Sequence, residues 1–256
     1  DQLSYMESVI WLFKKFYDDG LIYEGTRSSL YCTRCATPLS KFEITMDEGF
    51  YRDVTDTAVT TKFKEKNGNK YFLAWTTTPW TLPGNAALAI NEKEIYVEVE
   101  WKGDNFILAE KALSRIFGAD AINAIVVKKM IGAELIGRKY EPAYAFFSSG
   151  PNDFTIISAN FVTAEDGTGI VHVAPAFGEE DYLAGKESGL SVFMTIDDEG
   201  NFVKETGLFA GNYLKKAGLL IIADLKKRKL LFKEEKITHP YPFCYRCETP
   251  LIYKAQ

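Results

Sequence analysis

The sequence predicts a mixed α/β fold that is rich in β-strand and built as a barrel or a strongly curved sheet. Short runs of β-branched and aromatic residues recur from about residue 51 to residue 175, separated by Gly, Asn and Asp. In the clearest run, Ile95, Val97, Val99 and Trp101 alternate with polar or charged residues, which is the period of a half-buried strand. Few helices interrupt these runs, and that combination favours a barrel-like architecture.

The individual elements follow from local patterns. A helix is predicted over residues 3–19, because apolar residues recur at spacings of three and four and Gly20 is a suitable stop. Strands are expected over residues 58–63, 71–75, 95–101, 106–109, 125–129 and 154–161, with a hairpin turn at residues 67–69. Further helices are expected over residues 110–117, from about 178 to 189, and over 212–231.

The composition bounds the function. The chain has 256 residues, 46% of them apolar and 25% charged, which is ordinary for a globular protein, and its longest apolar runs are too short to cross a bilayer. A net charge of −5 argues against strong nonspecific binding to nucleic acid, but not against a module that contacts only the end of an RNA. The basic run of residues 226–229 is expected to be a solvated helix end, with RNA contact as the alternative.

The four cysteines form an internal repeat. Residues 32–39 and 244–251 both read C-x-R-C-x-T-P-L, one copy near each end of the chain. Two such pairs supply four thiolates, the ligand set of a structural zinc site, and a shared metal would bring the chain ends together. Two redox pairs, buried cysteines, or half-sites on different partners are the alternatives. The predicted ligands are Cys32, Cys35, Cys244 and Cys247.

Residues 75–85 form a polar loop after a predicted strand. The loop holds four threonines, and Pro79 and Pro83 force the chain to leave the sheet. Clustered hydroxyls suit the holding of a water, a ribose hydroxyl or an ester carbonyl, since each hydroxyl both donates and accepts. A strand end whose threonines serve only β-propensity explains the pattern equally well.

A second stretch, residues 167–182, leads from a strand through His172 and Pro175 into an acidic helix start. His172 is one of only two histidines in the chain, so few general bases are on offer. A lone histidine on a strand is more often a satisfied core residue, and acidic residues in a first turn often only complement the helix dipole.

Together, the loop T-T-T-P-W-T-L-P-G-N and the run H-V-A-P-A-F-G-E-E-D-Y resemble the two signature segments of the editing domain of isoleucyl-tRNA synthetases. The two C-x-R-C-x-T-P-L segments resemble that family's zinc-binding borders, and the resemblance covers essentially the whole chain. Valyl and leucyl enzymes typically have arginine where this chain has Thr78, which points to isoleucine. H-I-G-H and K-M-S-K-S are absent, so we expect a piece of a longer protein that cannot carry aminoacylation alone.

The resemblance implies a barrel-like editing domain of the Val/Leu/Ile type over residues 51–235. A helix and the first zinc knuckle would precede it in residues 1–50, and the second knuckle would follow in residues 236–256. The implied reaction is hydrolysis of valine misattached to the 3′ end of tRNA(Ile), and of valyl-adenylate as well. The partner would be the rest of a cytoplasmic synthetase that attaches isoleucine using ATP, with no membrane involved and with zinc in a structural role.

The same resemblance assigns roles to residues. Asp181 would pair with the α-amino group of the misattached amino acid, and His172 would stand beside its side chain and help to reject isoleucine. Thr77 and Trp80 would contact the substrate, Trp80 as part of the wall. The remaining residues would line the pocket and hold substrate or the attacking water: Thr76, Thr78, Thr81 and Asn85.

Two other classes of function compete with this interpretation. A non-catalytic, zinc-clasped module would bind the tRNA 3′ end without hydrolysing anything, and its threonine loop would be dispensable for catalysis. A freestanding metallohydrolase would need three protein ligands and a bound water on its zinc, whereas the sequence offers four thiolates.

Overall fold

The computed structural model describes residues 2–45 and 48–256. The α-helices are α1 (Leu3–Asp18), α2 (Lys41–Thr45), α3 (Leu113–Phe117), α4 (Glu179–Glu187) and α5 (Leu214–Lys227). The 3₁₀ helices are η1 (Glu48–Phe50), η2 (Pro79–Gly84), η3 (Glu110–Ala112), η4 (Gly118–Asn123), η5 (Gly132–Glu134) and η6 (Lys204–Phe209). The strands are β1 (Ser28–Cys32), β2 (Thr37–Leu39), β3 (Tyr51–Glu65), β4 (Lys70–Thr76), β5 (Ala87–Ile90), β6 (Ile95–Trp101), β7 (Asp104–Ala109), β8 (Ile125–Ile131), β9 (Tyr140–Glu141), β10 (Thr155–Ser158), β11 (Val171–Val173), β12 (Leu231–Pro242) and β13 (Ile252–Ala255).

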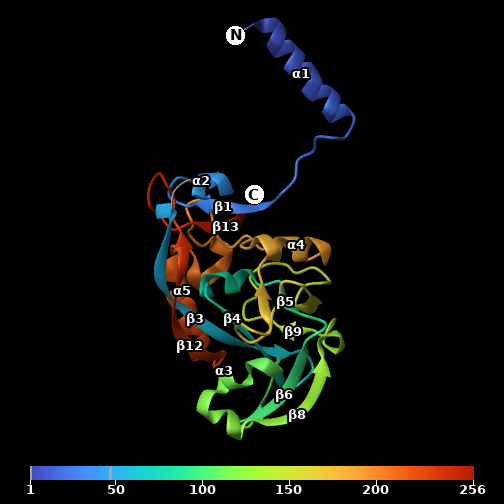
Figure 1. Ribbon diagram of the computed structural model, residues 1–256, viewed down its shortest axis with the longest axis vertical. Coiled ribbons are helices and arrows are strands. Elements are labelled where there is room, and N and C mark those ends of the chain that lie inside the picture. Colours follow the sequence, from blue (N-terminus) through green and yellow to red (C-terminus); the bar gives the residue numbers. More distant parts are fainter. Residues whose placement is uncertain (1, 46–47) are drawn as a thin grey trace.

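A large mixed sheet forms the body, which confirms the predicted β-rich α/β class. Its strand order is β10-β5-β11-β4-β7-β6-β8, and β3 joins it by pairing with β4, β9 and β12. The sheet curls around the main hydrophobic core (Figure 1), which includes the fully buried rings of Phe63, Phe72 and Tyr96. Within the sheet β4 runs parallel to β11, and this pairing places the ends of both strands side by side.

Two long antiparallel strands, β3 and β12, connect the body to the cysteine-bearing end of the molecule (Figure 1). The pairing runs from Thr61 opposite Leu231 to Tyr51 opposite Pro242. The predicted domain border at residues 235/236 falls within β12. Strands β3 and β12 therefore form one continuous two-stranded ribbon across this border. The prediction of a helix up to residue 231 is wrong at that end, because α5 stops at Lys227 and Lys229 has a φ of 59° that turns the chain into β12.

Most of the other predicted elements are confirmed with small shifts. The helix predicted over residues 110–117 begins as the 3₁₀ turn η3 and continues as α3, and the strand predicted over 154–161 narrows to β10. Asn67 has a φ of 64° at the turn between β3 and β4, as the hairpin prediction required. The alternating run Ile95–Trp101 is β6.

A small three-stranded sheet of order β13-β1-β2 lies at the end of the ribbon. It has a separate hydrophobic core that includes Leu30, Ile44 and Leu251 beside the cysteines. The chain segments at its edge meet, because Arg27 and Gln256 exchange backbone hydrogen bonds of 2.9 and 3.0 Å. The prediction that the chain ends meet is confirmed for Arg27 and Gln256, whereas the residues before Arg27 lead away into α1.

Helix α1 extends away from the rest of the molecule (Figure 1). It ends as predicted, with Gly20 in the left-handed conformation at a φ of 71°. Its apolar side chains, among them Trp11 and Phe13, are exposed, and no α1 residue is buried. Among the described residues, no helix has the length and apolarity needed to traverse a bilayer.

Candidate functional site

A cavity of about 350 Å³ opens where β4 and β11 end beside the first turn of α4. Val171 pairs with Trp75, and this register sets Thr76 next to His172 although they are far apart in sequence. The two stretches singled out in the sequence therefore line one cavity. Its lining comprises Trp75, Thr76, Thr77, Thr78, Thr81, Phe161, Thr163, Asp166, Gly167, Thr168, Gly169, Ile170, Val171, His172, Phe177 and Asp181.

The threonine loop is held by its own hydrogen bonds. Pro79 begins the 3₁₀ helix η2 and Pro83 lies inside it, so the chain leaves the sheet here, as the prolines predicted. The Thr81 hydroxyl donates to the Thr78 carbonyl at 2.8 Å, and the Thr78 amide donates to Thr76 Oγ1 at 3.1 Å. The loop therefore presents its hydroxyls to the cavity in a fixed arrangement.

The direction of each hydroxyl proton follows from these contacts. Because the Thr81 proton is committed to a carbonyl, the 3.3 Å contact between Thr78 and Thr81 requires Thr78 to donate. The 3.3 Å contact between Thr76 and Thr78 then requires Thr76 to donate. All three protons are used within the loop, so Thr76 and Thr78 offer lone pairs, not donors, to a molecule in the cavity.

His172 is buried and both of its ring nitrogens are engaged. Its Nδ1 accepts from the Asn85 amide at 3.0 Å, so its Nε2 carries the proton and donates to Thr81 Oγ1 at 2.9 Å. Burial lowers the pKa of His172 to about 4. The imidazole is therefore neutral at physiological pH, and neither nitrogen is free to take a proton from a water.

Asn85 does not line the cavity and instead fixes the histidine from behind. Its second amide proton goes to the Ala87 carbonyl at 2.8 Å, and its Oδ1 accepts from the Tyr140 hydroxyl at 2.6 Å. Tyr140 is buried, and burial holds the pKa of its hydroxyl well above the usual 10.0. Tyr140 thus orients Asn85, which in turn orients His172. Sequence reasoning missed Tyr140, since it lies on the short strand β9, far from both motifs.

Asp181 faces the cavity from the first turn of α4. One carboxylate oxygen accepts the Ala174 amide at 2.9 Å. Burial, with Glu180 as a smaller contribution, raises the pKa of Asp181 from 3.8 to about 7. Its two acidic neighbours are directed elsewhere, because Glu179 pairs with Lys41 at 2.8 Å and Glu180 is exposed. Of the three acidic residues in this turn, Asp181 is the one that reaches the cavity.

Trp80 lies outside this cavity, where the structure departs from the expected wall. Its ring packs edge-on against Phe177 at 5.1 Å between centroids, and it borders a neighbouring groove against α5. Trp80 therefore supports the cavity through Phe177, which is itself a lining residue. Thr77 lies on the boundary and lines both the cavity and the groove.

The loop of residues 163–169 contributes to the lining of the cavity, and the second candidate stretch in the sequence included only its last three residues, 167–169. Gly167 and Gly169 have φ values of 53° and 72°, and a Cβ on Gly167 would lie 3.1 Å from Trp75. Arg115 clamps this loop by donating to the carbonyls of Gly167 and Ala164 at 2.9 and 3.0 Å. The G-T-G spacing was the available signal, because two glycines so close together indicate a turn with special backbone angles.

The four cysteines of the repeats gather at the small sheet. Their sulfur atoms all lie within 4.8 Å of one another, and the 3.4 Å between Cys32 Sγ and Cys247 Sγ is far longer than a disulfide bond. Tetrahedral zinc bound at about 2.3 Å to each thiolate needs sulfur atoms about 3.8 Å apart. The cluster fits that ion in ligand type and spacing, and its four thiolates leave no open position for catalysis.

Comparison with known proteins places these features in a family. The model of the class I tRNA synthetases for I, L, M and V matches residues 2–142. Isoleucine–tRNA ligase of Bdellovibrio bacteriovorus is 45% identical over 258 residues, with 99% of this chain and 24% of the relative covered. The Mycobacterium tuberculosis ligase is 41% identical, with coverage of 99% and 26%. The chain thus spans about a quarter of these relatives' length.

Solved structures show the same fold at much lower identity. GlLeuRS-CP1 superimposes with a TM-score of 0.55 at 14% identity, over 68% of this chain and 97% of the other. The editing domain of the Plasmodium falciparum cytosolic leucyl-tRNA synthetase gives a TM-score of 0.54 at 11% identity, over 69% and 98%. The curled sheet and its covering elements therefore form a known domain architecture.

Proposed function

The chain belongs to the class I tRNA synthetases for isoleucine, leucine, methionine and valine, and we propose that it is the editing domain of an isoleucine–tRNA ligase. Its proposed reaction is hydrolysis of the ester between valine and the 3′ end of tRNA(Ile), and of valyl-adenylate. The similarity to isoleucine–tRNA ligases and the fold shared with leucyl-enzyme editing domains support this proposal. The parent enzyme would attach isoleucine using ATP in the cytoplasm.

Such a reaction would remove errors that a single binding pocket cannot prevent. A pocket that accepts isoleucine cannot strongly exclude valine, which is smaller by one methylene; this amino-acid pair is the standard illustration of the limit and not a result of the present structure. A second cavity that admits valine and excludes isoleucine by size removes the error.

Asp181 would bind the substrate's α-amino group. A carboxylate is the natural partner of an ammonium, and a desolvated pair of this kind has charge-assisted hydrogen bonds. An arriving cation would lower the pKa of Asp181 from about 7 and complete its ionisation. The contact to the Ala174 amide leaves the other carboxylate oxygen for the ligand.

A water would attack the ester directly. Thr76 and Thr78 would accept hydrogen bonds from this water with the lone pairs that the loop leaves open, and the substrate's ribose hydroxyls would help to polarise it. As the water oxygen bonds to the ester carbon, the bond to the ribose oxygen would break and the water's proton would pass to that departing oxygen. No cysteine or serine lines the cavity among the described residues, which favours water over a covalent intermediate. His172 is excluded as the general base, because both of its nitrogens are engaged.

His172 would instead limit the length of the amino-acid side chain. Its ring is fixed by Thr81 and Asn85, so it cannot move aside at low cost for an added methylene. Thr77 would contact the substrate at the cavity edge, and Trp80 would act through Phe177.

Residues 51–235 would form the editing unit, between a first segment of residues 1–50 and a last segment of residues 236–256. Zinc on the four cysteines would fasten these two segments in a structural role. The tRNA 3′ end and the rest of the synthetase would be the partners.

The convergence of Asp181, His172 and the threonine loop on one cavity is the observation that carries the proposal. The test is to incubate the chain with valyl- and isoleucyl-tRNA(Ile) and to follow deacylation. Release of valine with isoleucine left in place is expected. Binding of the tRNA with no hydrolysis of either would identify a non-catalytic module instead.

A further inference from the structure

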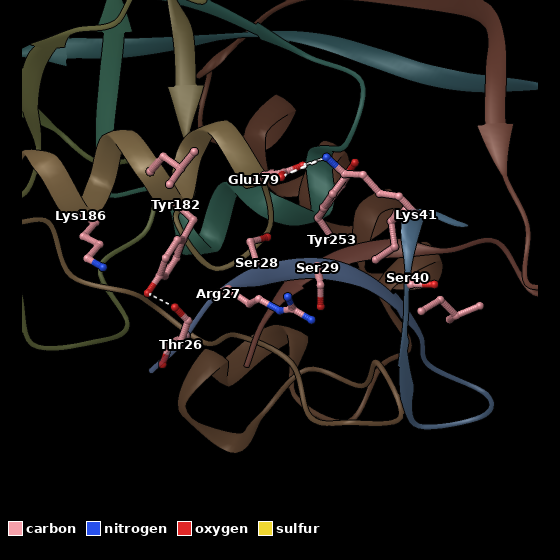
Figure 2. Close-up of a pocket in the computed structure, with 13 residues that line it drawn as sticks. Thr26, Arg27, Ser28, Ser29, Ser40, Lys41, Glu179, Tyr182, Lys186 and Tyr253 are labelled. Atoms are coloured by element: carbon pink, nitrogen blue, oxygen red, sulfur yellow. Dashed lines mark hydrogen bonds and ion pairs between the residues drawn. The ribbon is translucent and has the colours of Figure 1, made fainter. Parts of the chain in front are cut away.

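A second cavity, of about 560 Å³, lies on the other side of α4. Figure 2 shows its two walls: Arg27, Ser28 and Ser29 come from β1 and the residues before it, and Tyr182 and Lys186 come from α4. The Tyr182 hydroxyl donates to the Thr26 carbonyl at 2.8 Å and ties the two walls together.

Helix α4 separates this cavity from the site of Asp181. Glu179, Tyr182, Leu183 and Lys186 have the spacing of one helix face and line the second cavity, whereas Asp181 lines the first. The two cavities are therefore about one helix diameter apart, roughly 10 Å. A flexible strand that ends in the first cavity can reach the second.

The lining of the second cavity is positive although the chain carries a net charge of −5. Lys41 lies 2.8 Å from Glu179, and this pair neutralises the one carboxylate in the lining. In the part of the chain that the structure describes, neither Arg27 nor Lys186 has a carboxylate partner. Two cations thus remain available to an anion.

Ser28 supplies an independent sign of a missing ligand. Ser28 lines the cavity and the residue is 9% exposed, and its buried Oγ has no hydrogen-bond partner among the described residues. A buried hydroxyl without a partner is costly, since it has lost water and gained nothing. Its neighbour Ser29 is satisfied, because it accepts a hydrogen bond from Gln256 at 3.3 Å.

We propose that this second cavity binds a phosphate group of the RNA strand whose 3′ end occupies the cavity of Asp181. Arg27 and Lys186 would neutralise the phosphate, and the Ser28 hydroxyl would donate to one of its oxygens. The assignment to RNA rests on the proposed function, whereas the phosphate chemistry rests on the cavity alone. Held there, the strand would be fixed on both sides of α4.

The test measures binding of a fluorescent single-stranded RNA dodecamer to the whole chain over a range of salt concentrations. Lys186→Glu should weaken binding about tenfold, in line with the loss of one charge-assisted contact. It should also reduce the slope of log affinity against log salt by about 0.7. Lys216→Glu is the matched control, because Lys216 is also an exposed helical lysine outside the cavity and the change in net charge is the same.

Ser28→Ala separates binding from folding. It should weaken RNA binding several-fold while the melting temperature stays equal or rises, because no hydrogen bond is lost in the free protein. Equal effects of Lys186→Glu and Lys216→Glu, with no effect of Ser28→Ala, would overturn the proposal. If the chain binds inorganic phosphate tightly through Ser28 but does not bind the RNA, the cavity is a phosphate site. The assignment of that phosphate to an RNA strand is then refuted. The RNA is uncharged with amino acid, so these results are independent of whether the chain hydrolyses valyl-tRNA.

Discussion

Replacing Asp181 with asparagine should stabilise the fold at alkaline pH and slow the hydrolysis of valyl-tRNA. The raised pKa means that the folded chain holds a proton on Asp181 that the unfolded chain releases. Its contribution to stability is therefore fully present below pH 3.8 and is lost as the pH rises to about 7. Asparagine keeps the shape and the contact to the Ala174 amide without the titration.

The magnitude follows from the two pKa values. Each tenfold change in proton affinity corresponds to about 1.4 kcal/mol, so a rise from 3.8 to about 7 gives at most about 4 kcal/mol above pH 7. Because the cavity admits water, we expect about 2 kcal/mol, or a melting temperature higher by about 4–8 °C at pH 8. At pH 4 the variant and the parent chain should differ little.

The assay is urea or thermal unfolding of both chains at pH 4 and pH 8, with Glu187→Gln as the control. Glu187 lies in the same helix and is exposed, so the effect of its replacement on the free energy of unfolding should be small at both pH values. Deacylation of valyl-tRNA by Asp181→Asn should fall at least one to two decades, since a charge-assisted contact of about 1.5–3 kcal/mol is lost. A stability difference that is the same at both pH values would refute the reasoning about the carboxylate.

Three further predictions concern the rest of the site. His172→Ala should release isoleucine from correctly charged tRNA while valine release changes little, and deacylation of both charged tRNAs beside a melting curve checks this; parallel loss of both activities would make His172 the base. Tyr140→Phe should lower the free energy of unfolding by about 1–3 kcal/mol, because the buried Asn85 Oδ1 loses its donor, and it should relax the discrimination between valine and isoleucine. Metal analysis should find about one zinc per chain, and Cys244→Ser should reduce it; a disulfide in either cysteine pair, with no metal, would contradict the structural site.

Local patterns were sufficient to predict much of this fold. The alternation of Ile95 to Trp101 gives β6, and the left-handed turn at Asn67 gives the hairpin of β3 and β4. Strand β12 was missed because its residues alternate between half-buried and exposed positions, and Pro240 and Pro242 argue against a strand when read alone. Its pairing with β3 depends on residues about 180 positions away, which no local pattern reports.

In the candidate site, too, local motifs were predictable from the sequence and contacts between distant residues were not. The threonine loop and the stretch from His172 to Asp181 were visible as motifs, since their residue types suit the chemistry. Tyr140, Arg115 and residues 163–166 were not, because they act through contacts across the fold. Trp80 was predicted to form part of the cavity wall because it lies within the threonine motif. In the structure it packs against Phe177 and borders the groove beside α5 instead.

The polar network implies a division of labour between its parts. The chain Tyr140, Asn85, His172 and Thr81 is fully satisfied and uncharged, so it is rigid and loses nothing when the cavity is empty. Asp181 is the opposite case, because its buried carboxylate is costly until a cation arrives. Under the proposed function, the neutral network around His172 determines which amino-acid side chain fits the cavity. The desolvated carboxylate of Asp181 favours a ligand that carries an ammonium group. A substrate whose amino group is acylated should therefore escape hydrolysis even though its valine side chain fits.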